Sequence, residues 1–319
     1  MATPYPHTSM RRIISLLLLL ACLCTASAQQ APAFAHYWDM LPQFNAGAVG
    51  NNEQLRITAA YQAHNVGFED AGGTMYAGAD MAFALGKTRH GVGLVFEKDA
   101  IGLFAHQRFC AQYAYQQRLF GGRLGIGVEV DMLNEKVDGS KADLIDPNDP
   151  AFPASEMTGS KFDVSVGLFY QRKGLQVGLS AAHLTNPTIL MGETNEIKVN
   201  SLYNFYAAYN IKTKNPLFII APSTMLRYDG QEFRADITAR LLYAKDKQRL
   251  YGGLTYSPMH SVTGFVGGRF HGIDISYSYE ANTEGIGLLH GNHEVTLGYT
   301  LDLNLSKKGK NLHRSVRFL

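Results

Sequence analysis

The stretch His293–Leu305, HEVTLGYTLDLNL, alternates apolar and polar residues without a break. Val295 and Leu297 fall on one side of an extended chain and Glu294 and Thr296 on the other, because successive side chains of a strand point to opposite faces. The alternation lasts about twice as long as an ordinary soluble strand of roughly 5–6 residues. A tilted strand needs about 9–11 residues to cross a bilayer. The stretch therefore predicts a membrane-crossing strand with one face toward lipid and the other toward a polar interior.

The same alternation recurs along nearly the whole chain, and no useful helical periodicity accompanies it. A sheet exposed to lipid must close, because an open edge would leave unpaired backbone groups in hydrocarbon. The sequence therefore predicts an all-β fold, a transmembrane antiparallel up-and-down β-barrel of about 14 strands. The expected strands are 54–62, 75–86, 90–98, 103–117, 122–137, 161–172, 174–184, 201–212, 217–228, 231–245, 249–257, 260–270, 272–281 and 292–305.

The connections between these strands support the same architecture. If the mature N-terminus lies in the periplasm, every even-numbered connection turns inside and is short, such as FGG after Leu119 and RKG after Gln171. The two longest connections, which begin at Asp138 and Thr185, both fall outside. Short periplasmic turns and longer outer loops are typical of outer-membrane barrels. The predicted localisation is the outer membrane, with outer-membrane lipid around the barrel.

The first 28 residues carry the features of a cleaved signal peptide. Arg11 and Arg12 precede the apolar run ISLLLLLACLC, and Ala26-Ser27-Ala28 forms a small-residue cleavage site. An alternative is lipoprotein processing at Cys22, although Leu20 fits such a site poorly. After cleavage, 27 basic and 27 acidic residues remain, because 29 less the two signal arginines gives 27. This zero net charge argues against nucleic acid as a partner.

Two segments flank the predicted barrel of residues 54–305. Residues 29–53 are too apolar for a free tail and are expected to pack inside the barrel or at its periplasmic mouth as a plug. Residues 306–319 form a basic tail expected in the periplasm, where it would dock on an acidic ring subunit or touch anionic headgroups. The candidate plug residues are Tyr37, Trp38 and Phe44, and the candidate partner-binding residues are Lys307, Lys308, Lys310, Arg314 and Arg317.

No pattern in the chain predicts an enzyme, a cofactor or a metal site. Ser180, His183 and His293 stand near strand ends, but no GxSxG or HExxH motif accompanies them. The acidic outer loop 138–160 lacks the spacing and the glycine turn of a calcium loop. The charges on the polar strand faces predict paired side chains that fill the lumen, or a polar conduit. They are Arg56, Glu129, Asp131, Asp163, Arg234, Asp236, Arg240, Asp274, Glu280, Glu294 and Asp302.

Four blocks resemble, in order and at plausible spacing, the PorP/SprF family of outer-membrane proteins of the Bacteroidetes type IX secretion system. The longest is KFDVSVGLFYQRKGLQVGLSAAHLTNP at Lys161–Pro187, which resembles the family's strand-turn-strand block. FNAGAVG at Phe44–Gly50 resembles its N-terminal element. The segments Leu217–Tyr243 and Ile273–Tyr299 resemble its proline-serine strand and its Tyr-Ser-Tyr and His-Glu element.

The resemblance implies a non-enzymatic role in protein secretion, and in gliding motility where the cargo includes adhesins. The implied partners are a periplasmic ring lipoprotein and its companion, PorK-like and PorN-like, and secreted proteins that bear a C-terminal secretion domain. The residues alone leave a second function open, a transport barrel for a hydrophobic or small solute. A stable complex with periplasmic lipoproteins would favour the first function, and a conducting pore or bound lipid in the lumen would favour the second.

Overall fold

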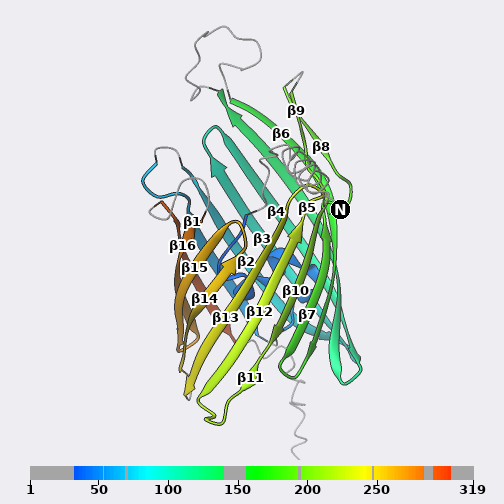
Figure 1. Ribbon diagram of the computed structural model, residues 1–319. Helices are drawn as coiled ribbons and strands as arrows, with labels where there is room; N and C mark the ends of the chain where they lie inside the picture. Colours follow the sequence, from blue (N-terminus) through cyan, green and yellow to red (C-terminus); the bar gives the residue numbers. More distant parts are fainter. Residues whose placement is uncertain are drawn as a thin grey trace, which may run out of the picture. The chain divides into compact units, whose positions relative to one another are not determined.

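The computed structural model describes residues 32–52, 54–68, 71–139, 156–192, 195–245, 248–283 and 290–302. Long antiparallel strands dominate these residues, and three short helical turns precede the first strand (Figure 1). The helical turns are η1 (Tyr37–Asp39), α2 (Leu41–Phe44) and η2 (Ala46–Ala48). Within the described ranges, no helix has the length and apolar character needed to cross a membrane.

The strands form one closed sheet and one separate hairpin. The sheet strands are β1 (Leu55–Ala63), β2 (Gly73–Leu85), β3 (Thr88–Ile101), β4 (Phe104–Leu119), β5 (Gly122–Asp138), β6 (Glu156–Arg172), β7 (Leu175–Ala182), β10 (Leu202–Tyr209), β11 (Ile211–Lys212), β12 (Phe218–Tyr228), β13 (Phe233–Lys245), β14 (Gln248–Ser257), β15 (Ser261–Phe270), β16 (Ile273–Asn282) and β17 (Asn292–Leu301). The separate hairpin pairs β8 (Thr188–Met191) with β9 (Asn195–Lys198).

Two pairings close the sheet into a barrel. β1 pairs with β17, with Leu55 opposite Leu301, and β10 pairs with β12, with Tyr203 opposite Tyr228. Every other neighbouring pair is antiparallel and consecutive apart from the β8–β9 insertion, and the short β11 continues β10 after Asn210. The predicted antiparallel barrel of 14 strands is therefore confirmed.

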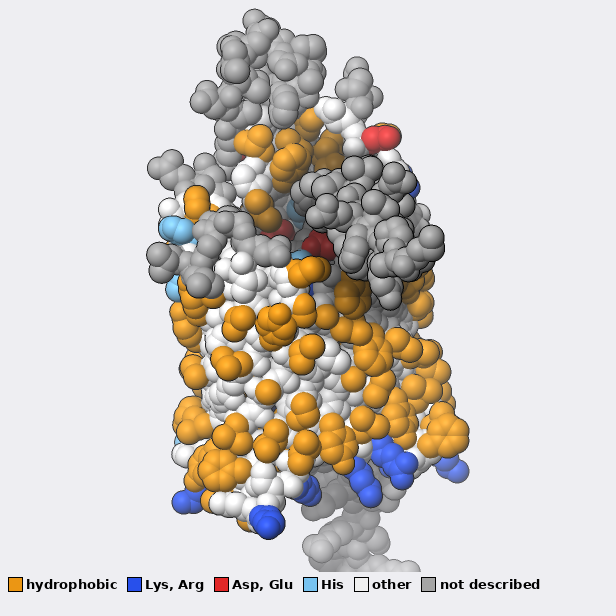
Figure 2. Space-filling view, viewed as in Figure 1, with side chains coloured by type: hydrophobic (Ala, Val, Ile, Leu, Met, Phe, Trp, Pro, Cys, Tyr) orange, Lys and Arg blue, Asp and Glu red, His pale blue; other side chains and the backbone are white. Residues whose placement is uncertain are grey.

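The two faces of the strands see different surroundings, as the alternation predicts. In β17, Val295 and Leu297 are 45% and 50% exposed on the outer surface, whereas Glu294 and Thr296 are 1% and 3% exposed inside. Hydrophobic side chains spread over the outer wall, and Lys and Arg side chains gather at one end of it (Figure 2). This outer surface suits a hydrocarbon environment, and the strand period of two produces it.

Connection lengths differ between the two ends of the barrel. We call one end the short-turn mouth, where tight connections join β2–β3, β4–β5, β6–β7, β11–β12, β13–β14 and β15–β16. The longest connections, β5–β6 and β7–β10, are at the other end.

One of these long connections contains a hairpin that the sequence did not predict. The segment that begins at Thr185 contains the β8–β9 hairpin, in which Ile189 is completely buried. Its backbone lies against β6, because a Cβ at Gly159 would fall 2.2 Å from the Leu190 carbonyl oxygen.

Strand ends differ most from the sequence expectation at the start of β6 and at the end of β17. β6 begins at Glu156 instead of residue 161. Its first residues are mostly polar and pair with β5 through Asp138 opposite Glu156, so no apolar alternation marks them. β17 ends at Leu301, and residues 303–305 of the expected strand lie outside the described residues.

Candidate functional site

The lumen contains the chain's own N-terminal segment, residues 32–52. Its helical turns η1, α2 and η2 lie within the ring of strands, drawn in blue in Figure 1. Pro42 occupies the first turn of α2, where a missing backbone N–H costs nothing. Asn45 then leaves the helix in an extended conformation, and its side chain accepts a hydrogen bond from the Gly47 N–H. The segment thus folds into compact turns that fit inside the barrel.

The three candidate plug residues all point into the packed lumen. Tyr37, Trp38 and Phe44 are 1%, 7% and 9% exposed, and they belong to one buried cluster that also includes side chains of the inner wall. The Trp38 ring lies 4.9 Å from that of Phe265 on β15. The Tyr37 hydroxyl donates a hydrogen bond to Thr238 at 2.8 Å. The inner wall therefore offers an apolar patch that matches the aromatic face of the segment.

A buried carboxylate on the last strand holds the start of the segment. Glu294 accepts hydrogen bonds from the backbone N–H groups of Ala35, at 2.6 Å, and His36, at 3.1 Å. Its Oε1 also lies 2.7 Å from His36 Nδ1. Hydrogen bonds to an ionised group are shorter and stronger than neutral ones. Glu294 therefore replaces the water that these backbone groups would otherwise bind.

Ion pairing and a cation–π contact fix the first helical turn. Asp39 pairs with Arg56 of β1 at 2.8 Å, and the Arg240 guanidinium lies 4.1 Å from the centre of the Trp38 ring. Burial alone would raise the pKa of Asp39, but Arg56 and the other basic side chains around it together hold that pKa below its usual value. The carboxylate is therefore ionised, and the turn is tied to both β1 and β13.

Glycines on the inner wall let the segment's backbone approach closely. A Cβ at Gly127 of β5 would lie 2.2 Å from the carbonyl carbon of Ala46, a distance no real side chain occupies. A Cβ at Gly47 would in turn meet the Gly167 oxygen at 2.8 Å. The inward positions of β5 and β6 thus form a flat track for η2. The sequence placed these glycines on the polar face but did not reveal what they accommodate.

Most of the charges predicted to face the lumen are paired. Arg108, which the sequence reasoning did not single out, lies 3.1 Å from Glu129, 3.5 Å from Asp131 and 3.6 Å from Glu97. It also donates to the Gln43 carbonyl of the segment at 3.2 Å. The charges of one side of the lumen are therefore connected to the segment.

The opposite side of the lumen carries a second network. Arg234 binds Asp236 and Glu280, both at 2.9 Å, and Arg227 binds Asp236. Arg227 also donates to the Pro32 carbonyl at 3.1 Å. Paired charges thus fill the lumen beside the segment. Through Arg227 they also bind Pro32, the first residue of the segment, to the wall.

Three predicted charges have partners elsewhere. Asp163 binds His183 at 2.7 Å, and Asp274 binds Arg269 at 2.6 Å. Asp302 is exposed and accepts a hydrogen bond from Gln54.

The serine and histidine considered for catalysis bind different partners. Ser180 donates to the Phe44 carbonyl at 2.5 Å, whereas His183 contacts Asp163. The Nδ1 atom of His293 lies 2.7 Å from the Tyr277 hydroxyl. These contacts serve the packing of the segment and the wall.

One group of side chains has the composition of a metal site. Ligand atoms of Cys110, Glu129 and Asp131 lie within 4.8 Å of one another and are buried. Arg108 already supplies a positive charge to both carboxylates. A cation there would be repelled by the guanidinium, so the arrangement fits an internal ion pair better than a metal.

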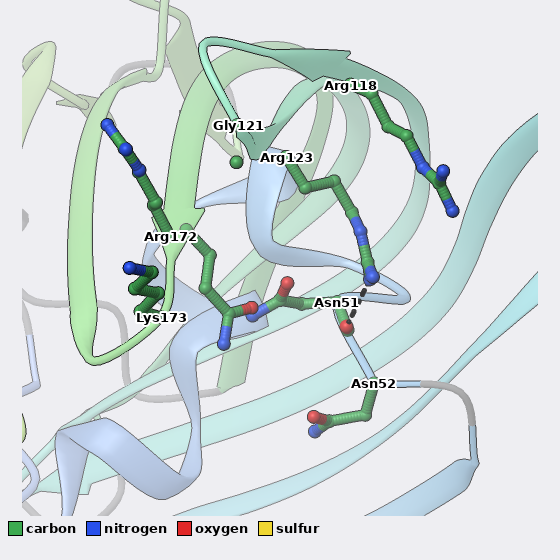
Figure 3. Close-up of a pocket in the computed structure, with 9 residues that line it drawn as sticks. Asn51, Asn52, Arg118, Gly121, Arg123, Arg172 and Lys173 are labelled. Carbon is green, nitrogen blue, oxygen red and sulfur yellow. Dashed lines mark hydrogen bonds between the residues drawn. The ribbon is translucent and has the colours of Figure 1, made fainter.

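The basic tail with Lys307, Lys308, Lys310, Arg314 and Arg317 lies outside the described residues. The described structure instead shows a basic cavity at the short-turn mouth that the sequence reasoning missed. It has a volume of about 620 Å³ and is lined by Asn51, Asn52, Arg118, Gly121, Gly122, Arg123, Gln171, Arg172 and Lys173 (Figure 3). The sequence signal was present in the two basic turns, FGGR and RKG, but their approach to residues 51–52 depends on the closed barrel.

Comparison with known proteins gives a family match and distant structural similarities. The family model of the type IX secretion system membrane protein PorP/SprF matches residues 26–299. A search of curated proteins returned no match. Among solved structures, the CymD monoaromatic hydrocarbon channel has a TM-score of 0.48 at 11% identity, covering 86% of this chain and 95% of that chain. A TodX deltaS2S3 mutant monoaromatic hydrocarbon channel has 0.46 at 11% identity, with coverages of 78% and 89%. A mutant porin of Rh. blastica has 0.32 at 10% identity, with coverages of 78% and 99%. These structural similarities are too distant to carry a function to this chain.

Proposed function

Because the chain belongs to the PorP/SprF family of type IX secretion system membrane proteins, we propose that it is a non-enzymatic barrel component of that system. In this role it supports the export or surface retention of proteins with a C-terminal secretion domain. It links the outer membrane to periplasmic ring components, namely a PorK-like lipoprotein and its PorN-like companion. The family is described as a secretion-system membrane protein and not as a group of enzymes.

The observation that carries this proposal beyond family membership is the filled lumen. Residues 32–52 pack against opposite walls, through Glu294 and Ser180, and bury an aromatic cluster between them. A barrel whose lumen is filled by its own N-terminal segment is suited to act through its rims and loops. We assign Tyr37, Trp38 and Phe44 to a plug that closes the lumen, with Trp38 at its centre.

The orientation follows the length of the connections. We place the short-turn mouth in the periplasm and the β5–β6 and β7–β10 connections outside. The tail 306–319, with five basic residues and no acid, then leaves β17 on the periplasmic side. Its Lys307, Lys308, Lys310, Arg314 and Arg317 dock on an acidic ring subunit, and the attraction weakens with salt.

The alternative function is a transport barrel for a hydrophobic or small solute. It requires a continuous path, and the N-terminal segment occupies the space such a path would use. Planar-bilayer conductance, or lipid recovered from the lumen of the purified protein, would favour this alternative.

The deciding experiment is a pull-down of the tagged protein from native outer membranes in mild detergent, followed by mass spectrometry. Recovery of periplasmic ring lipoproteins or of secreted proteins with a C-terminal secretion domain supports the proposal. Recovery of the barrel alone, with a solute in its lumen, contradicts it. Truncation after Leu305 then tests the tail, since loss of the ring components with retention of the barrel assigns their docking to residues 306–319.

A further inference from the structure

The basic cavity at the short-turn mouth is built from three separate parts of the chain. Arg118 is the second-last residue of β4, Arg123 is the second residue of β5, and Arg172 and Lys173 lie at the β6–β7 turn. Asn51 and Asn52, where the N-terminal segment leaves the lumen, form the opposing wall (Figure 3). The cavity therefore lies between the inner side of the mouth and the end of the segment.

Tight turns fix the positions of these cations. The β4–β5 connection consists of Phe120 and Gly121, with φ of 49° and 72°, the two left-handed residues of a type I′ turn. Lys173, with φ of 52°, occupies the tight β6–β7 turn. Arg123 donates to the Asn51 carbonyl at 3.0 Å, which joins the turn region to the segment. The cations are thus held on short connections between long strands and not on flexible loops.

The cavity collects positive charge without internal compensation. Its lining residues include four cations and no carboxylate. Arg118, Arg172 and Lys173 are exposed, and their side chains form no hydrogen bond or ion pair with any part of the chain that the structure describes. This differs from the lumen, where Arg108, Arg227 and Arg234 are all paired. Like charges held together repel one another until an anion binds between them.

We propose that this cavity binds an acidic peptide segment of a partner protein, with the peptide carboxylates between Arg118, Arg172 and Lys173. A volume of about 620 Å³ exceeds what one phosphate or carboxylate group needs and accommodates a few residues of chain. The amide side chains of Asn51 and Asn52 lie where they can bind the peptide backbone. Arginine forks match carboxylates in a bidentate geometry.

Two other occupants fit the position less well. Arg172 has the outward register of β6, but the lining also includes the inner-wall residue Arg123 and, at Asn51 and Asn52, the end of the lumen segment, which a lipid headgroup at the outer wall contacts less readily. The chain's own tail, 306–319, carries five cations and no acid, so it is repelled from the site. This proposal rests on the proposed function in one respect, namely that the short-turn mouth, and therefore the peptide, lies in the periplasm.

The test measures binding of a rhodamine-labelled hexaglutamate peptide to the purified full-length protein by fluorescence anisotropy in nonionic detergent. A hexaglutamine peptide serves as the uncharged probe. The site variant combines Arg118→Gln, Arg172→Gln and Lys173→Gln and leaves Arg123 in place. The matched rim variant combines Lys212→Gln, Lys214→Gln and Arg249→Gln, which removes the same charge from the same mouth at exposed positions outside the cavity. An unchanged heat-dependent gel shift establishes that each variant is folded, and the single variants replace a triple variant that fails to fold.

We expect the site variant to bind hexaglutamate at least about tenfold more weakly and the rim variant within about twofold of the parent protein. Hexaglutamine should bind none of the three proteins measurably, and binding of hexaglutamate to the parent protein should weaken as salt increases. Equal losses in the two variants would mean a diffuse attraction to the rim and would overturn the proposal. Complete displacement of the peptide by inorganic phosphate at the same anion concentration would identify a small-anion site, and exclusive binding of phosphatidylglycerol vesicles would identify a lipid site. Either result also overturns the proposal.

Absence of hexaglutamate binding leaves the proposed family role unaffected, because the pull-down tests that role without the peptide.

Discussion

At the scale of single residues, packing inside the barrel depends on positions without a side chain as much as on the side chains that are present. Gly127 shows this, because its absent side chain leaves room for the backbone of Ala46. Glu294 shows the complementary case, because one carboxylate binds two backbone N–H groups and a histidine ring. Both residues stand on strands, yet both act on the N-terminal segment, which is far from either of them in the sequence. The lumen segment is therefore sensitive to substitutions that leave the barrel wall intact.

Gly127→Val should displace the N-terminal segment. The new side chain would overlap η2, and overpacking of this kind costs about 1–3 kcal/mol. We expect Trp38 fluorescence to become accessible to iodide while the barrel keeps its gel shift. The outward Gly264→Ala is the control, since its Cβ would meet only Leu254 at an ordinary 3.8 Å. Unchanged quenching in Gly127→Val would show that η2 does not depend on this approach.

Glu294→Gln should loosen the start of the segment. The substitution removes the charge that strengthens the hydrogen bonds to Ala35 and His36, at a cost of roughly 1.5–3 kcal/mol. We expect limited proteolysis to cut the segment faster and the thermal midpoint to fall. Glu196→Gln, on the exposed side of β9, should leave both unchanged. Equal proteolysis rates for the two variants would contradict the anchoring role of Glu294.

At the scale of elements, the strands could be predicted from the sequence because their signal is local. Alternation with a period of two identifies each strand from its own residues, whereas at the start of β6 polar residues from Glu156 continue the pairing beyond the alternation. The contacts of the lumen segment have no such signal. His36 meets Glu294 across 258 positions, and only barrel closure brings them together. The β8–β9 hairpin was missed because its strands are short and half polar.

Deletion of residues 34–50, with the predicted signal peptide and its cleavage site retained, should open the lumen. These residues supply the aromatic cluster that fills it, and the remaining wall charges can be hydrated by water. We expect planar-bilayer conductance to rise strongly above that of the parent protein. Deletion of the β8–β9 hairpin, 188–198, serves as the control and should leave conductance low. A deletion protein that conducts no better than its parent would rule out the segment as the barrier.

At the scale of the whole molecule, the two ends of the barrel differ in charge and in connection length. The short-turn mouth carries exposed cations on several turns, among them Lys87, Lys173 and Lys214. The long connections lie at the other end. This polarity gives the molecule a direction in the membrane. It also places the basic cavity and the C-terminal end of β17 on the same side.

Cysteine labelling of intact cells should reveal this direction. Cys110 is the only cysteine outside the predicted signal peptide and is 4% exposed, so it should give little background. Lys214→Cys and Gln231→Cys lie beyond opposite ends of β12 and are exposed. An impermeant maleimide should label Gln231→Cys in intact cells and Lys214→Cys only after permeabilisation. The reverse pattern would invert the orientation and place the basic cavity outside the cell.

The seating of residues 32–52 also imposes an order on biogenesis. These residues leave the ribosome before any strand, yet Glu294, which binds Ala35 and His36, lies on the last strand to be made. The segment therefore lacks its Glu294 partner until β17 is made and pairs with β1. Pairing between strands so far apart in the sequence is slow. Burial of Trp38 in the aromatic cluster therefore indicates that β1 and β17 have paired and that the barrel is closed.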